Sequence, residues 1–379
     1  MVENVRSAWI DINLDKLRGN IDKLKGVVAQ DSKIMGVIKA DGYGHGAVEV
    51  ASILREEGIG RFAVAISEEG IELRESGFTE PILIFGNTPE EDYDKIAKYT
   101  LTPTIYSLPD ARKLDRAARH GGIKIPVHIK IDTGMGRLGF VPDAEALCDI
   151  EAISKLENIH IEGIFSHMSS ADKEDNEKSL RQYKQFIGFL DTLASRGVSI
   201  PIRHIANSAV MLKFPQMHLD LVRAGICMYG IYPSAQMANA PAINLQQMME
   251  VKARLVHVKK VPCSTEIGYG GTFKTDRESV IGTVPLGYAD GISAAMSNKA
   301  EFLAGGRRRR VVGRICMDQL MIDLTEGPQV RAGDEVVIMG RQGNEMITAD
   351  EIAGHAGTIS YEVVTRMGKR LSRVYAGKR

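Results

Sequence analysis

Lys39 follows a short apolar run in the segment GVIKADGYGHG, a position that favours chemistry at its amine. An amine at the end of a buried strand is partly desolvated, and cationic neighbours repel its charge, so both effects lower its pKa. The neutral amine that results is the nucleophile that Schiff-base formation needs. Taken alone, a lysine at the end of a strand is more often a solvated rim residue, so the interpretation of Lys39 depends on its partners.

Further reactive side chains stand at the ends of other apolar runs. They are Arg137 in KIDTGMGRLGF, His167 in IFSHMSSAD, His204, Asn207 and Ser208 in RHIANSA, and Arg223, Gly225 and Ile226 in LVRAGICMYG. The backbone amides of the RAG segment and the hydroxyl of Ser208, at the start of a short helix, offer a cradle for a phosphate. Position alone therefore indicates either a phosphate-bearing aldehyde cofactor or a phosphosugar aldolase, and it leaves both open.

Eight β-branched runs, separated by amphipathic segments, must position these residues. The runs span residues 33–39, 61–66, 81–86, 102–106, 125–132, 161–167, 202–207 and 220–230. Their alternation with helix-like segments predicts an α/β fold, and near-continuous apolar strands fit a parallel sheet buried on both faces. The commonest closed solution is a (β/α)8 TIM-like barrel, whose active site lies at the carboxyl ends of the strands. An open doubly wound sheet is the alternative, although no G-x-G-x-x-G turn follows an early strand.

The sequence changes character after about residue 240. Segments such as MEVKARLVHVKKV, SVIGTVPLGYADG and DEVVIMG are typical of strands separated by Gly-rich or charged turns. A chain of 379 residues also exceeds the size at which one core keeps growing. We therefore expect two domains, with residues 1–240 as the barrel and residues 241–379 as a mostly-β domain. The basic run 307–310 is interpreted as a solvated hairpin loop, with a polyanion contact as the alternative.

The charge balance and the cysteines narrow the classes of function. Lys plus Arg and Asp plus Glu both number 48, so nothing global draws the chain to nucleic acid or to an anionic membrane. The 4 cysteines lie far apart and form no C-x-x-C pair, which predicts no metal site and no disulfide framework. The N-terminal segment lacks an apolar signal core, and no run of about 18 apolar residues occurs. We therefore expect a cytoplasmic protein.

The segment GVIKADGYGHG is similar to the one that attaches pyridoxal 5′-phosphate to a lysine in bacterial alanine racemases. Other blocks that resemble this family follow in the family's order: KIDTGMGRLGF, HMSSAD, HIANSA, RAGICMYGIYPS, GYGGTF, PLGYADG, VVGRICMDQLMIDL and ISYEVVTRM. They cover essentially the full length. The resemblance implies an isomerase that interconverts L- and D-alanine, for peptidoglycan synthesis or for alanine catabolism. It also implies pyridoxal phosphate as the cofactor and a homodimer as the working unit.

The resemblance further implies that two residues handle the proton on the substrate's Cα. Lys39 holds the cofactor as a Schiff base and acts on one face, and Tyr269, in GYGGTF, acts on the opposite face. Two groups are needed because racemisation removes a proton from one side and returns one to the other. A phenol titrates at about 10, so a phenolate base needs positive charge nearby. His167 and Arg223 are the candidates for that charge.

Three cationic residues and a set of phosphate contacts are also implied by resemblance. Arg223 would face the cofactor's pyridine nitrogen, where it donates a hydrogen bond without transferring its proton. Arg137 would contact the cofactor's phenolic oxygen and the substrate carboxylate, and Lys130 matches a position that is often carbamylated and then orients Arg137. His204 and Asn207 would flank the ring. The implied phosphate contacts are Tyr43, Ser208, Tyr361 and the amides of Gly225 and Ile226.

Tyr269, Met317 and Asp318 lie in the β domain, which in this family completes the site of the partner subunit. Met317 and Asp318 would meet the substrate carboxylate through a main-chain amide, and Tyr288 and Tyr361 would narrow the access to the site. Small residues at 293–295 depart from the family pattern, which leaves a broader serine and alanine racemase as an alternative. A fold-related amino acid decarboxylase would lack KADGYGHG, and a non-catalytic pyridoxal-phosphate carrier would lack the β domain.

Overall fold

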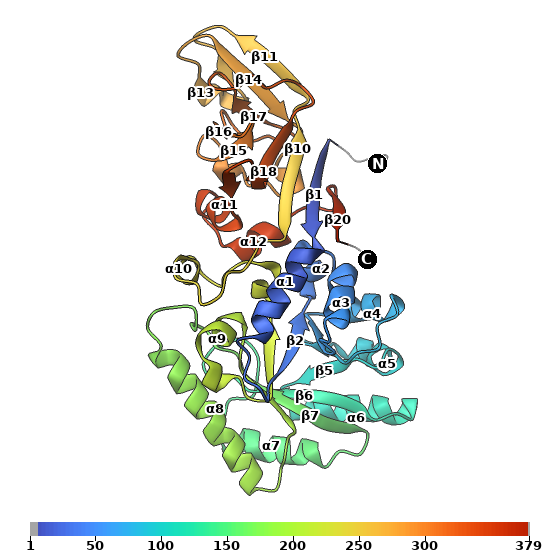
Figure 1. Cartoon of the computed structure of the whole chain (residues 1–379). Helices are drawn as coiled ribbons and strands as arrows, with labels where there is room; N and C mark the ends of the chain where they lie inside the picture. Colours follow the sequence, from blue (N-terminus) through green and yellow to red (C-terminus); the bar gives the residue numbers. More distant parts are fainter. Residues whose placement is uncertain (1–6, 378–379) are drawn as a thin grey trace.

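Eight parallel strands form the N-terminal unit of the computed structural model, which describes residues 7–377 (Figure 1). Their order is β8-β7-β6-β5-β4-β3-β2-β9. The strands are β2 (Lys33–Val37), β3 (Phe62–Val64), β4 (Ile82–Ile84), β5 (Thr102–Ile105), β6 (Ile125–Lys130), β7 (Ile159–Phe165), β8 (Ile202–His204) and β9 (Leu221–Ala224). Two hydrogen bonds link β8 and β9 across the remaining gap, from Asp220 N to Arg203 O (3.1 Å) and from Arg223 N to Ala206 O (3.0 Å). The predicted eight-stranded barrel is confirmed.

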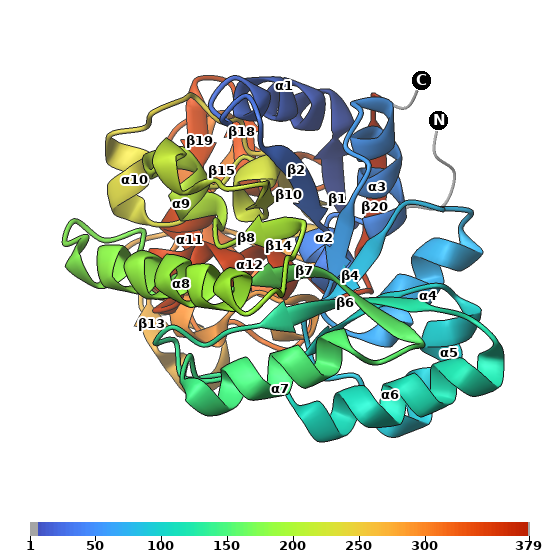
Figure 2. The same cartoon turned by 90° about the horizontal axis from the view of Figure 1, so that it is seen from below.

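Helices cover the outside of the barrel strands (Figure 2). They are α3 (Ala47–Glu56), α4 (Ser67–Glu75), α5 (Tyr93–Lys98), α6 (Leu108–Gly121), α7 (Ala144–Ser154), α8 (Glu177–Ser195) and α9 (Ser208–Lys213). Helix α6 shows why they begin and end where they do. Ser107 Oγ accepts from Asp110 N at its start, and Gly122 adopts a left-handed conformation at its end. The three strands β3, β4 and β5 are buried at every residue, as a parallel sheet covered on both faces requires.

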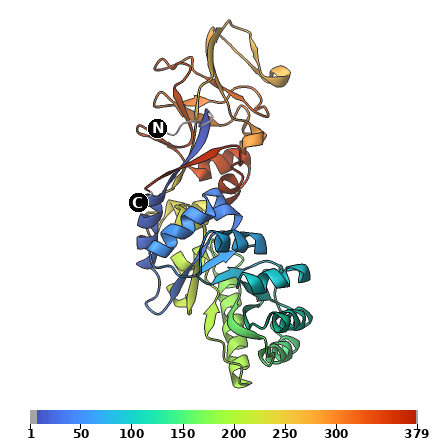
Figure 3. The ribbon, with the colours of Figure 1, turned by 90° about the vertical axis from the view of Figure 1, so that its right-hand side faces the viewer.

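The C-terminal unit is mostly β, as predicted, and stands at one end of the barrel (Figures 1 and 3). Its main sheet has the order β16-β15-β18-β10-β1-β20, β19 pairs with β18, and smaller sheets contain β11-β14-β17 and β12-β13. The strands are β10 (Met249–Arg254), β11 (His257–Val261), β12 (Glu266–Ile267), β13 (Phe273–Lys274), β14 (Ser279–Val284), β15 (Glu301–Ala304), β16 (Arg307–Arg310), β17 (Leu320–Asp323), β18 (Glu335–Gln342), β19 (Glu345–Ile347) and β20 (Ser372–Ala376). Two short helices, α11 (Ala349–Ala356) and α12 (Ser360–Thr365), pack together beside this sheet. Helix α12 also contacts the barrel's α2 segment (Lys39–Gly44).

The first described strand, β1 (Ala8–Asn13), belongs to the sheet of the C-terminal unit, although its place in the chain lies within the residues expected to form the barrel. It pairs antiparallel with β10 and parallel with β20. Its alternating burial, with Ala8, Ile10 and Ile12 inside, is the pattern of a strand with one face on a core. Helix α1 (Leu14–Lys25) then leads the chain to the barrel. Asn20 of α1 links the end of the barrel to the segment that leads into β10, because its Nδ2 donates to Met228 O (3.0 Å) and to Gln246 O (2.8 Å).

The basic run 307–310 is a strand and not the expected hairpin loop. It forms strand β16, paired with β15 through a turn at Gly305 and Gly306, both of which have positive φ. Arg308 contacts the carboxylates of Glu345 and Glu351, and buried Arg309 donates to Ala304 O. These contacts satisfy the two guanidinium groups within the chain. Among the described residues, no helix is long and apolar enough to cross a membrane.

Candidate active site

The backbone after Lys39 makes a left-handed turn. Residues 40–43 of α2 all have φ between 52° and 59° and ψ between 39° and 51°. Only one of the four is a glycine, and a left-handed conformation costs other L-residues about 1–2 kcal/mol each. Contacts from outside the turn hold it, since Ala40 N donates to a Glu69 carboxylate oxygen and Ala47 N donates to Asp41 Oδ1 (2.9 Å). Such backbone strain clusters at functional sites.

The electrostatics around Lys39 favour its neutral form. The side chain is half-buried, and burial lowers the pKa of its amine. The charge of Arg137 lowers that pKa further, while the charge of Glu69 opposes the shift. A neutral amine at the carboxyl end of β2 is a competent nucleophile.

Arg137 reaches this region from a loop that closes on itself after β6. The loop is pinned at its base, because Asp132 N donates to Phe140 O and Phe140 N donates to Lys130 O (both 2.8 Å). Inside the loop, the Asp132 carboxylate accepts from three backbone amides, of residues 134, 135 and 136, at 2.8–2.9 Å. Gly139 is required there, because a Cβ on it would lie 2.6 Å from Asp132 N. Arg137 has no carboxylate partner within residues 7–377, so its charge is available to an anion.

Arg223 is the most firmly held cation of the site. The residue is 3% exposed, and its Nη1 lies 3.0 Å from His204 Nδ1 while its Nη2 lies 3.2 Å from His167 Nδ1. Nη2 also donates to Ser166 O (3.0 Å) and Ile205 O (3.1 Å). Burial, followed by the charge of Arg137, lowers the pKa of Arg223 to about 9, so it stays charged at neutral pH. Arginine only donates, so both histidines accept at Nδ1.

Both histidines are neutral. Burial first, and then the charge of Arg223, lowers the pKa of His167 and of His204 well below the ordinary value. His204 also stacks on Phe165, with the ring centroids 4.8 Å apart and the planes at 10°. Burial therefore works against a positive charge on His167, and Arg223 is the better candidate for the cation beside Tyr269.

Hydroxyl groups and a backbone amide converge near Gly225. Gly225 N donates to Ser208 Oγ (3.0 Å), and a Cβ built on Gly225 would lie 3.1 Å from Tyr43 Oη and 3.4 Å from Ser208 Oγ. The ring of Tyr361, on α12, lies 6.3 Å from that of Tyr43. Asn207 caps α9 through its Oδ1, which accepts from Val210 N (3.1 Å), and this fixes Ser208 as the first helical residue. The buried Ile226 follows Gly225 directly. The cluster can hold a small oxyanion.

Lys130, on β6, lies beneath these groups in a buried environment. Its Nζ donates to Ile131 O (2.9 Å) and lies 5.2 Å from the centre of the Phe165 ring. Burial, and then the charges of Arg223 and Arg137, lowers the pKa of Lys130 to about 7. An amine with that pKa is partly neutral at physiological pH, which the proposed carbamylation requires.

Four predicted residues of the β domain, Tyr269, Tyr288, Met317 and Asp318, make no hydrogen bond or ion pair with this cluster among the described residues. Tyr269, in the turn between β12 and β13, is 73% exposed, and Met317 and Tyr288 are 53% and 48% exposed. Figure 1 shows β13 in the part of the β domain that is farthest from the barrel. Asp318 is held by Arg370, whose Nη2 donates to its Oδ1 (2.8 Å). A single chain therefore brings together the barrel residues and Tyr361, but not these four.

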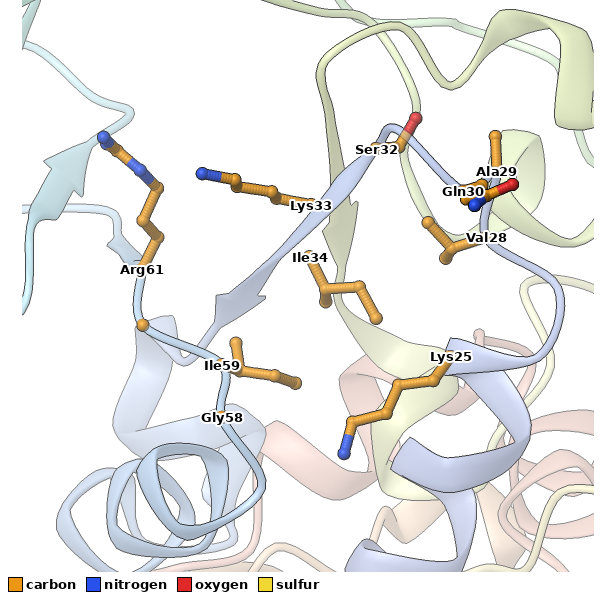
Figure 4. A pocket seen from close by; sticks show the side chains of 11 residues that line it. Lys25, Val28, Ala29, Gln30, Ser32, Lys33, Ile34, Gly58, Ile59 and Arg61 are labelled. Atoms are coloured by element: carbon orange, nitrogen blue, oxygen red, sulfur yellow. The ribbon is translucent and has the colours of Figure 1, made fainter.

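A pocket lies away from the cluster, beside the start of β2 and the segment before β3. It has a volume of about 530 Å³, and Figure 4 shows Lys25, Lys33 and Arg61 around apolar side chains such as Ile34 and Ile59. A smaller cavity of about 200 Å³ lies among α11, α12 and β18. The candidate active site rests on the converging polar groups rather than on the size of a cavity.

Two residues that complete the polar interior of the barrel were not predicted. His128, on β6, is fully buried, and its Nδ1 lies 2.9 Å from His204 Nε2. Glu162, on β7, lies 3.1 Å from His128 Nε2. His128 stands two residues before Lys130 on one strand, so the period of two could have placed both side chains inside the barrel.

Comparison with known proteins finds a single family over nearly the whole chain. Models for the N-terminal and C-terminal domains of alanine racemase match residues 12–233 and 248–375. Alanine racemase 1 of Clostridium acetobutylicum is 45% identical over 375 residues, which are 99% of this chain and 97% of that protein. The structure of alanine racemase from Clostridium difficile 630 is similar with a TM-score of 0.93 and 41% identity, covering 99% of this chain and 97% of that one. The Bacillus anthracis alanine racemase with bound L-Ala-P gives a TM-score of 0.94 at 33% identity, over 99% and 96%.

Proposed function

We propose, from the premise that this chain belongs to the alanine racemase family, that it interconverts L- and D-alanine with pyridoxal 5′-phosphate held on Lys39. Its relatives are alanine racemases over their full length, and the family's reaction is an isomerisation. The observation that carries the proposal is the left-handed turn, which joins the Lys39 amine to the Tyr43 hydroxyl of the oxyanion cluster within five residues. The alternatives of a serine-accepting racemase and of a decarboxylase gain no support from the comparisons.

The residues present fit a phosphate-bearing pyridine aldehyde. Gly225 leaves open the space beside the Tyr43 and Ser208 hydroxyls that a Cβ would fill, and Tyr361 lies close to Tyr43. The guanidinium of Arg223 is held in place by four hydrogen bonds, and it could donate a further one to the ring nitrogen of the cofactor. When bound, pyridoxal phosphate withdraws electrons from the substrate's Cα and so makes its proton easier to remove.

The chain's own residues then handle that proton and the substrate's charge. Lys39 Nζ, whose pKa is lowered by burial and by Arg137, exchanges the proton on one face of Cα. Arg137, without a carboxylate partner among the described residues, binds the substrate carboxylate. Arg223, still charged at neutral pH, keeps its own proton and limits how much negative charge the ring receives.

The second proton-handling group comes from another copy of the chain. Tyr269, Tyr288 and Met317 are exposed on the β domain, and Ile66 and Val141 are 48% and 65% exposed just beyond β3 and β6 of the barrel. A head-to-tail homodimer would cover both sets, and it would bring Tyr269 Oη to the face of Cα opposite Lys39. The Met317 and Asp318 segment and Tyr288 would join the same site. The expected location in the cytoplasm stays a prediction.

Deuterium exchange tests the reaction and the lysine together. The purified protein, supplied with pyridoxal phosphate and L-alanine in deuterated water, should form D-alanine that carries deuterium at Cα. Lys39→Ala should abolish both, whereas Lys33→Ala, a matched change of an exposed lysine at the other end of β2, should not. Wild-type protein that incorporates no deuterium, or a Lys39→Ala variant that still does, would contradict the proposal.

A further inference from the structure

A line of hydrogen-bonded polar groups crosses the interior of the barrel, from Arg223 to the amino-terminal ends of the strands. His204 Nε2 lies 2.9 Å from His128 Nδ1, and His128 Nε2 lies 3.1 Å from Glu162 Oε2. Arg61 closes the line with two hydrogen bonds to Glu162, from Nη2 to Oε1 (2.8 Å) and from Nη1 to Oε2 (3.2 Å). Both histidines are fully buried. The cation of the active site is therefore linked through four side chains to the far end of the barrel.

An irregularity in β7 aims Glu162 at this line. The parallel register of β6 and β7 pairs Val127 with Ile161 and then His128 with Gly163, so Glu162 is left without an opposite residue. A bulge of this kind re-aims a side chain, and bulges in parallel pairs are rare. Gly163 is needed beside it, because a Cβ there would lie 2.4 Å from His128 Cε1. The backbone is thus shaped to bring the carboxylate and the imidazole together.

The hydrogen bonds have one possible direction. Arg223 can only donate, so His204 accepts at Nδ1 and carries its proton on Nε2. His204 therefore donates to His128 Nδ1, and His128 in turn carries its proton on Nε2 and donates to Glu162. A carboxylate accepts only, and its other donor is Arg61. Every group in the line is satisfied in this arrangement and in no other.

The charge states agree with this direction. Burial lowers the pKa of His128, so its ring is neutral. Burial alone would raise the pKa of Glu162, but the hydrogen bonds from His128 and Arg61 bring it down to about 2. Glu162 is therefore ionised at neutral pH. Arg61 also lines the large pocket at this end of the barrel (Figure 4), so solvent reaches the outer end of the line.

We propose that Glu162 is a positioning residue for the racemase reaction, which fixes the tautomers of His128 and His204 from one end of the line, as Arg223 does from the other, and so keeps an acceptor in front of Arg223. This inference rests on the proposed function only in assigning Arg223 to the cofactor's ring nitrogen. Glu162 touches neither substrate nor cofactor. Its action is relayed through two imidazoles that have no alternative arrangement while the carboxylate is present.

The substitution Glu162→Gln separates charge from shape. An amide can donate as well as accept, so His128 can then carry its proton on Nδ1 and His204 on Nδ1. In that reversed line a donor of His204 faces a donor of Arg223, and the guanidinium loses one of its four fixed contacts. At metal sites, the outer partners that orient a ligating histidine are worth about 10- to 100-fold in activity, and we take the same scale for this line. We expect kcat to fall by about that factor with KM little changed, and Glu162→Asp to restore most of the rate.

Nitrogen-15 NMR of the histidine side chains in the cofactor-free protein reads the tautomers directly. The wild type should show His128 and His204 neutral at pH 7, both protonated on Nε2, and Glu162→Gln should show the second tautomer of each. The control is Asp220→Asn, which alters another arginine–carboxylate pair at the same end of the barrel, with Arg203 (2.7 Å), outside the line. This control should change neither the tautomers nor kcat.

The outcomes are separable. A wild type with either histidine protonated, or with its proton on Nδ1, would overturn the inference even if the Glu162→Gln variant failed to fold. A Glu162→Gln variant that folds with unchanged tautomers and unchanged kcat would also overturn it. A wild type with the expected tautomers but no racemase activity would instead refute the proposed function.

Discussion

Gly225→Ala should weaken cofactor binding through its phosphate and through nothing else. The new Cβ would lie 3.1 Å from Tyr43 Oη and 3.4 Å from Ser208 Oγ. A phosphate oxygen that accepts from both hydroxyls would lie about 2.7 Å from each, so the Cβ occupies the same space. Hydrogen bonds to a charged group contribute about 1.5–3 kcal/mol each. Loss of two therefore costs at least about 3 kcal/mol, or roughly a hundredfold in Kd.

The assay compares pyridoxal phosphate with pyridoxal, which lacks the phosphate. Titration of the cofactor-free protein, followed by absorbance, should give a Kd for pyridoxal phosphate that is about a hundredfold weaker in the variant, with the Kd for pyridoxal unchanged. Gly188→Ala is the matched control, because a Cβ on Gly188 meets nothing within 4 Å. The reasoning is refuted if a variant with the wild-type melting temperature binds pyridoxal phosphate within about threefold of the wild type, or if both ligands weaken equally.

Three further predictions concern stability. Arg223→Ala leaves four buried acceptors without their donor. The free energy of unfolding, measured in urea, should fall by about 3–5 kcal/mol, and a loss under 1 kcal/mol would contradict the described contacts. The pKa of Lys130 is about 7 in the folded protein and 10.5 for an exposed lysine, so between these pH values the unfolded chain binds more protons than the folded one. The free energy of unfolding should therefore rise with pH in this range, compared with a Lys130→Met variant. Parallel pH profiles of the two proteins would argue against the shift. Gly163→Ala places a Cβ against the His128 ring and should lower the free energy of unfolding by about 1–3 kcal/mol in the same urea experiment. An unchanged unfolding midpoint would show that the ring moves aside freely.

The sequence predicts the barrel well because its strands are apolar on both sides and alternate with amphipathic helices. It predicts that the reactive side chains of the barrel lie near one another, because the carboxyl ends of parallel strands meet at one end. The strand β1 is different. Its alternation of apolar and polar residues indicates a strand with one covered face. Its partners β10 and β20 lie far along the chain, so the order of elements in the sequence does not show which sheet it joins.

Two features of the site could not be found in the sequence. Glu162 stands between Ile161 and Gly163, and nothing in the sequence marks the register shift that leaves Glu162 without an opposite residue on β6. The left-handed turn after Lys39 contains one glycine in four residues, so its conformation is imposed by outside contacts such as that of Glu69. In both cases the neighbouring structure decides the local geometry.

The central claim, that Lys39 of one copy and Tyr269 of another act on one substrate, is tested most directly by mixing two inactive variants. Lys39→Ala and Tyr269→Phe, unfolded and refolded together in equal amounts, should form mixed dimers in half of the population. Each mixed dimer has one site with both residues intact, so racemase activity should return to about a quarter of the wild-type value. A mixture that stays inactive, although mixed dimers are present, would show that both residues must come from the same chain.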